Sequence, residues 1–135
     1  MFPTVRGAKA ALRGARSAAF VDTIVIDGED LTDAVFRLEV RDRRDGGELR
    51  AGLDTVASAG AEGVRVVSVD TSGDLPVTTL GIRINETTME AMPGEADGLD
   101  PGEDVTIWWG MHITDGGLKF LAFDGPFTVE ASTPA

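Results

Sequence analysis

The chain has no cysteine among its 135 residues, so it can form neither a disulfide bond nor a thiolate metal site. It has one histidine, His112, and it lacks the Gly-x-Ser-x-Gly motif of hydrolases, the Walker phosphate loop and the dinucleotide-binding glycine motif. No apolar run approaches the roughly 20 residues that a membrane-spanning helix needs. The residue inventory therefore predicts a protein without catalytic residues, without a cofactor and without a membrane partner.

Basic residues are concentrated at the N-terminus of a chain that is otherwise acidic. Residues 1–21 contain four basic side chains and no acid, whereas the whole chain has 23 acidic and 12 basic residues and a net charge of −11. An acidic body repels the phosphates of nucleic acids. We therefore expect no nucleic-acid partner.

The N-terminal basic residues follow helical spacing, which predicts an arm over residues 1–19. Gly7 and Gly14 each cost a helix about 1 kcal/mol relative to alanine, so an isolated arm would be only marginally helical. Two interpretations stay open: a solvated tail, or a segment that becomes ordered against a neighbouring subunit. In the second case the partner-binding residues are Phe2, Val5, Arg6, Lys9, Leu12, Arg13 and Arg16.

Apolar and polar side chains alternate with period two from Phe20 onward, as they do in half-buried strands. The predicted strands span residues 20–27, 34–42, 48–53, 64–69, 77–84, 105–114, 118–123 and 127–130. Residues 85–92 form a short helical link, residues 124–126 a turn, and residues 131–135 a tail. The spacing predicts one all-β domain over residues 20–130, an antiparallel immunoglobulin-like sandwich of about seven strands.

Trp108 and Trp109 are adjacent, so in a strand their side chains point to opposite faces of the sheet. Trp109 shares its face with Ile107 and Met111, which predicts that Trp109 lies in the core. Trp108 then lies on the outer face with His112, where it can anchor a partner protein. The alternatives are that a loop or the arm covers Trp108, or that it forms a platform for a carbohydrate.

Acidic residues gather in two predicted loops, residues 27–30 and residues 95–104. Calcium takes six to eight oxygen ligands, often from loops of this kind. The spacing of an EF-hand is absent, and acids in turns are commonly just solvated. Calcium binding therefore stays an alternative, and no residue is assigned as a metal ligand.

Three segments carry a resemblance to a known family. Residues 30–42 read Asp-Leu-Thr-Asp-Ala-Val-Phe-Arg-Leu-Glu-Val-Arg-Asp, residues 82–93 run from a strand into Thr-Thr-Met-Glu-Ala-Met-Pro, and residues 108–129 end on Gly-Pro-Phe-Thr-Val. Together they resemble the immunoglobulin-like N-terminal domain of phage baseplate upper proteins, over about residues 20–130. Asp33 stands where that family often has glycine, and the basic arm and the acidic loop over residues 95–104 look like additions.

The resemblance implies a non-enzymatic structural component of a phage particle, made in the bacterial cytoplasm and assembled in several copies with other virion structural proteins. A tail or baseplate subunit is the first interpretation, and a capsid decoration protein is the second. A rival from a different class is a carbohydrate- or calcium-binding sandwich of a bacterial surface protein, which the lack of a secretory signal disfavours. A small hydrolase is a third.

Overall fold

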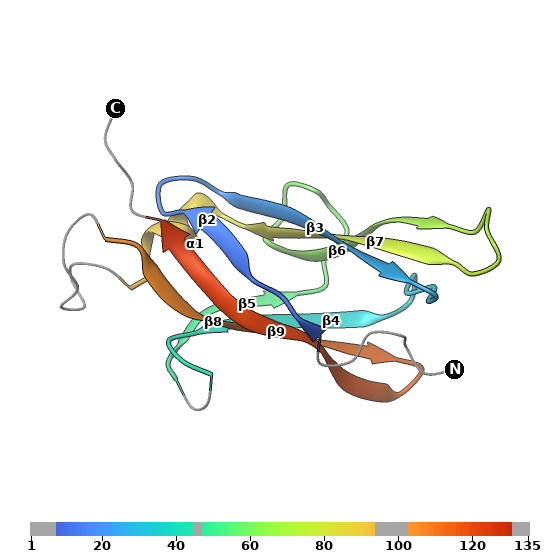
Figure 1. Ribbon diagram of the computed structural model, residues 1–135. Coiled ribbons are helices and arrows are strands. Elements are labelled where there is room, and N and C mark those ends of the chain that lie inside the picture. Colours follow the sequence, from blue (N-terminus) through green and yellow to red (C-terminus); the bar gives the residue numbers. More distant parts are fainter. Residues whose placement is uncertain (1–7, 45–46, 94–102, 131–135) are drawn as a thin grey trace.

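The computed structural model describes residues 8–44, 47–93 and 103–130, which form two β-sheets packed face to face (Figure 1). The described strands are β1 (Ala8–Lys9), β2 (Leu12–Ala15), β3 (Phe20–Asp27), β4 (Val35–Arg41), β5 (Leu49–Asp54), β6 (Gly63–Asp70), β7 (Val77–Ile84), β8 (Val105–Asp115) and β9 (Leu118–Glu130). One short helix, α1 (Glu86–Glu90), follows β7. The predicted all-β sandwich is confirmed, and its strand pairing is mostly antiparallel.

The larger sheet has the order β1-β9-β8-β4-β5, with β2 also paired to β9, and the smaller sheet has the order β3-β7-β6. The two sheets meet at the β5 and β6 edges, where Thr55 and Val64 form a parallel bridge. The backbone N–H of Val56 also donates a 2.9 Å hydrogen bond to the carbonyl of Val64. This connection leaves β3 at the other edge of the smaller sheet.

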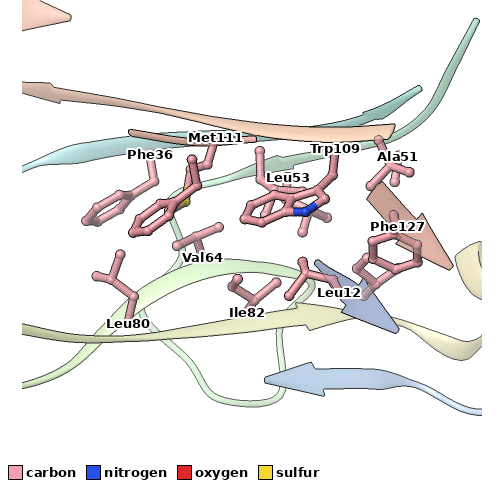
Figure 2. Packing of buried hydrophobic residues seen from close by; sticks show 14 of the residues in the cluster. Leu12, Phe36, Ala51, Leu53, Val64, Leu80, Ile82, Trp109, Met111 and Phe127 are labelled. Atoms are coloured by element: carbon pink, nitrogen blue, oxygen red, sulfur yellow. The ribbon is translucent and has the colours of Figure 1, made fainter. Parts of the chain in front are cut away.

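The core lies between the two sheets and follows from the alternation in the strands. Trp109 and Met111 of β8 have no exposed surface, and Phe36 of β4 is 1% exposed. These side chains meet Leu80 and Ile82 of the smaller sheet (Figure 2). Truncating a buried aromatic residue of this kind to alanine typically costs about 3–5 kcal/mol.

The N-terminal segment is part of the larger sheet, and here the sequence prediction is wrong. Residues 8–15 form β1 and β2, which run parallel to β9 in one continuous register. Leu12 pairs with Phe127 and points into the core, where it is 7% exposed (Figure 2). The predicted helical arm outside the sandwich is therefore incorrect for these residues. The spacing of the basic residues fits a helix, but the same segment also fits an edge strand, because Leu12 is buried and its other described side chains are mostly small or solvent-facing.

The break between β1 and β2 has a specific cause in β9. Ala10 donates its N–H to the Asp124 carbonyl at 3.0 Å, and a parallel ladder would next bring a backbone N–H from residue 126 to the Ala10 carbonyl. Residue 126 is a proline and has no N–H. The indole Nε1 of Trp109 donates to that carbonyl instead, at 3.0 Å. A core side chain thus fastens the N-terminal strand to the sheet.

Gly125 makes this arrangement possible. A side-chain Cβ at Gly125 would overlap the carbonyl oxygen of Ala10. Residues 124–126 therefore do not form the predicted turn, because they lie inside β9 and pair with β8, and Asp124 also pairs with Lys9 of β1. The Asp-Gly-Pro sequence is typical of a turn, but here the missing side chain of Gly125 allows the backbone at Ala10 to come close to β9.

Candidate partner-binding surface

The residues of the predicted arm lie in different places, and only some of them are described by the structure. Phe2, Val5 and Arg6 lie outside the described residues, and of Lys9 only the backbone, in β1, is described. Leu12 is buried inside the chain itself. Among the arm residues that the structure describes, Leu12 is thus part of the core and not of a free docking segment.

The two arginines of this segment bind other parts of the same chain. Arg16 donates from Nη1 to the carbonyl of Met92 at 2.7 Å and from Nη2 to that of Pro93 at 2.6 Å, so it fixes the turn after β2 to the segment that follows α1. Arg13 forms ion pairs with Glu130 at 3.2 Å and Asp104 at 3.5 Å. Both side chains act in the fold.

The second predicted surface is the one around Trp108. Trp109 lies in the core, and Trp108 is half-buried on the outer face of the larger sheet, as the alternation in β8 predicts. On this face, Trp108 lies between Arg41 of β4 and Pro126 of β9. His112 lies further along β8 and faces outward as well.

A recess of about 280 Å³ opens beside Trp108. Gly110 lines the recess, lies between Glu39 of β4 and Asp124 of β9, and contributes no side chain to the face. A Cβ added to Gly110 would lie 3.7 Å from Cδ1 of Leu121 on β9, so this leucine side chain borders the recess. The recess is lined by Glu39, Arg41, Arg44, Trp108, Trp109, Gly110, His112, Leu121 and Asp124.

Arginines on both sides of Glu39 hold the face in order. Arg41 contacts the Glu39 carboxylate at 2.9 Å and Arg37 contacts it at 3.2 Å. Burial opposes ionisation of Glu39, but these two arginines outweigh it and lower the pKa of the carboxyl group. Gly52 on β5 leaves room for this arrangement, since a Cβ there would lie 2.5 Å from Nη2 of Arg37. The charged row on β4 is therefore preformed.

Arg44 connects the two sides of the recess. Its guanidinium carbon lies 5.6 Å from the centre of a Trp108 ring, a cation–π distance. Its Nη2 also lies 3.8 Å from Oδ2 of Asp124, whose side chain is only 5% exposed. Arg44 itself is 60% exposed, so it covers part of Trp108 and remains accessible.

The chemistry of this face suits recognition of a protein. Tryptophan and arginine are the residue types most enriched at the energetic centres of interfaces. The recess can accept an apolar or small polar side chain beside Trp108, and the exposed Arg44 can meet backbone carbonyls of a partner. Ordered side chains lose little conformational entropy on binding.

The acidic loops do not form a metal site in the described part of the chain. No group of three or more histidine, aspartate or glutamate side chains there is placed to hold a metal ion. The Asp30 carboxylate instead accepts hydrogen bonds from the hydroxyl of Thr32 at 2.5 Å and from its backbone N–H at 3.0 Å, which lowers the pKa of Asp30. Residues 95, 97 and 100 of the second loop lie outside the described residues. Among the described helices, none has the length and apolar character needed to cross a membrane.

The sequence interpretation found Trp108 but missed most of its neighbours. The alternation in β4 already places Arg37, Glu39 and Arg41 on one face, and this signal could have joined them to Trp108. The sequence pattern predicts turns at Asp124 and at Arg44, the latter between the predicted strands 34–42 and 48–53. Their place beside Trp108 depends on the pairing of β4, β8 and β9, which no local pattern contains.

Comparisons with known proteins give a general likeness only. No family model and no curated protein matches the chain. Among solved structures, the chain is similar to the CupB6 tip adhesin from Pseudomonas aeruginosa, with 14% sequence identity and a TM-score of 0.43. That likeness covers 99% of this chain and 43% of the adhesin chain. At this level of likeness, nothing about the function of this chain follows.

Proposed function

We propose that this chain is a non-enzymatic protein-binding module of a multi-protein particle, and that it binds its partner through the outer face of β4, β8 and β9. The observation that carries the proposal is the preformed recess beside the half-buried Trp108. The particle that we propose is a phage tail or baseplate, from the resemblance of residues 20–130 to baseplate upper proteins. Capsid decoration is the second choice of location.

Electrostatics supports a protein partner over other classes. The net charge of −11 disfavours anionic polymers, and the arginines of the face are already engaged with carboxylates of the chain. Such paired charges orient a partner and keep wrong partners away more than they add affinity. Affinity would come from burial of Trp108 and Leu121.

The test uses particles produced by the bacterium that encodes the chain. Purified particles carrying wild-type chain, Trp108→Ala or the control Val35→Ser are compared by quantitative mass spectrometry. Val35 is 58% exposed and lies at the start of β4, away from the recess. We expect normal incorporation of the control and loss of Trp108→Ala, with all three isolated chains folded at the temperature of assembly.

Two outcomes of this test contradict different parts of the proposal. If the wild-type chain is absent from the particles, the phage assignment is wrong. If Trp108→Ala is incorporated like wild type, the binding surface lies elsewhere. The number of copies per particle separates a tail location from a capsid location.

A second candidate is carbohydrate binding, and one observation favours it. The recess places polar side chains, those of Glu39, His112 and Asp124, beside an aromatic ring, which is how proteins hold sugars by stacking and hydrogen bonds. This candidate predicts that the isolated chain binds immobilised glycans and that Trp108→Ala abolishes this binding. Absence of glycan binding by the wild-type chain excludes it.

A further inference from the structure

Strand β3 lies at the open edge of the smaller sheet and is unusually exposed. It pairs with β7 along one side, and among the described strands none pairs with its other side. Val21 is 66% exposed and Val25 is 57% exposed, and Asp22 and Thr23 between them are exposed as well. A long edge strand rich in β-branched residues is a template for pairing with another chain.

The backbone groups that face the open edge can be identified. The N–H of Thr23 donates to the side-chain carboxylate of Asp22 at 2.8 Å, so it points away from β7. The N–H of Gly28 donates to the Pro76 carbonyl, just before β7, at 2.8 Å. Because the direction alternates along a strand, the N–H and C=O groups of odd-numbered residues of β3 face outward.

We propose that β3 pairs with β3 of a second copy of this chain, antiparallel and centred on Thr23. In this register Thr23 faces its own counterpart, and Val21 faces Val25 of the other copy. Threonine–threonine pairs and pairs of β-branched residues are favourable between neighbouring strands. The Val-x-Thr-x-Val pattern is self-complementary, as a twofold interface requires. The pairing joins the smaller sheets of two copies into one continuous sheet.

Negative charge limits the strength of this dimer. The two Asp22 carboxylates become diagonal neighbours about 7–8 Å apart on one face, and like charges there repel. The net charge of −11 on each copy adds a longer-range repulsion that salt screens. We therefore expect a weak dimer that salt strengthens. A cationic partner on the same edge would show the opposite dependence on salt.

Sedimentation velocity of the full-length chain, from micromolar to millimolar concentration and at two salt concentrations, tests the proposal. Asp22→Asn should lower the dimer dissociation constant by about two- to fivefold, because it removes the repulsion. Thr23→Pro should abolish the dimer and keep the fold, because the N–H that it removes is not bonded to β7. Val25→Lys should abolish it too, whereas Val35→Lys, at a matched 58% exposure, should not.

A cross-link reports the register directly, because the chain has no cysteine of its own. Directly opposed residues of the outward-facing set have Cα atoms about 5.5 Å apart, which a disulfide can bridge. Thr23→Cys should therefore oxidise to a covalent dimer, and Val21→Cys, which faces position 25, should not. A wild-type chain that stays monomeric at millimolar concentration in high salt overturns the proposal. A dimer that survives both Val25→Lys and Thr23→Pro overturns it as well.

Discussion

Replacing Trp109 with phenylalanine tests how the N-terminal strand is held. The substitution removes the indole N–H that donates to the Ala10 carbonyl at 3.0 Å. Leaving a buried acceptor without a partner costs about 1–3 kcal/mol, and the half-buried position of Ala10 favours the lower half of that range. The smaller ring in a fully buried site adds about 1–2 kcal/mol. We expect a loss of about 2–4 kcal/mol in the free energy of unfolding.

The assay is urea unfolding followed by far-ultraviolet circular dichroism, which does not depend on tryptophan fluorescence. Trp108→Phe is the matched control, because the same change on the half-buried outer face should cost less than about 1 kcal/mol. A double-mutant cycle with Pro126→Ala isolates the hydrogen bond. In wild type, Pro126→Ala should destabilise the chain by about 0.5–1 kcal/mol through unfolded-state entropy.

In the Trp109→Phe background, Pro126→Ala gives the Ala10 carbonyl a new backbone donor and should be neutral or stabilising. A coupling of about 1 kcal/mol between the two positions would support the interpretation of the β1–β2 break. If Pro126→Ala costs the same in both backgrounds, the proline and the indole do not serve the same carbonyl, and that interpretation fails.

The remaining predictions concern other contacts and use unfolding measurements as well. Arg16→Met removes two hydrogen bonds to carbonyls and should lower the free energy of unfolding in urea by about 1.5–3 kcal/mol. Arg13→Met removes only exposed ion pairs and should lower it by about 0–1 kcal/mol. Equal losses for the two variants would refute the anchoring role of Arg16. Thr78→Val removes the buried hydroxyl that donates to the Glu29 carbonyl at 2.6 Å and accepts from the Leu31 N–H at 3.1 Å. It should lower the free energy of unfolding by about 1–3 kcal/mol. The control Thr79→Val, on the outer face, should change that free energy by about 0.5 kcal/mol or less. The pKa of Glu39 is lowered in the folded state, so its stabilising effect is complete above the unfolded pKa of about 4.3 and is lost as the pH falls through the folded pKa. Unfolding between pH 7 and pH 3 should therefore show a steeper acid loss for wild type than for Glu39→Gln, and parallel curves would contradict this.

The strands that sequence alone predicts well are those of the body between residues 20 and 115. β3 and β7 have the predicted bounds, and β4, β5, β6 and β8 differ from the predicted ranges by a residue or so at their ends. In β4, β7 and β8 most apolar side chains point to one face and pack on the opposite sheet, so the local pattern and the tertiary structure agree. β3 is predicted equally well although Val21 and Val25 are exposed, because its run of β-branched residues also favours a strand.

The N-terminal strand and the middle of β9 could not be predicted in this way. Residues 8–15 are short, rich in small side chains and without an alternating apolar set, so nothing local distinguishes an edge strand from an arm. Gly125 and Pro126 have turn propensity, and it is overridden because the Ala10 backbone and the Trp109 indole use the space that they leave. Both errors come from contacts between opposite ends of the chain.

The candidate surface was predictable only in part. The adjacent tryptophans fix that one faces the core and the other faces outward, and this prediction is confirmed for Trp109 and Trp108. The recess depends on Gly110 lying between Glu39 and Asp124, which requires the register of three strands.

Hydrogen exchange of the chain, free and within its native particle, tests most directly whether binding uses the Trp108 face or an N-terminal arm. With β1 and β2 in the sheet, the amides of Ala10 and Arg16 should already exchange slowly in the free chain, because they donate to the carbonyls of Asp124 and Glu130. Assembly should then add protection at residues 39–44 and 108–112. Fast exchange of residues 10–16 in the free chain, with protection gained there alone on assembly, would contradict this and restore the docking arm.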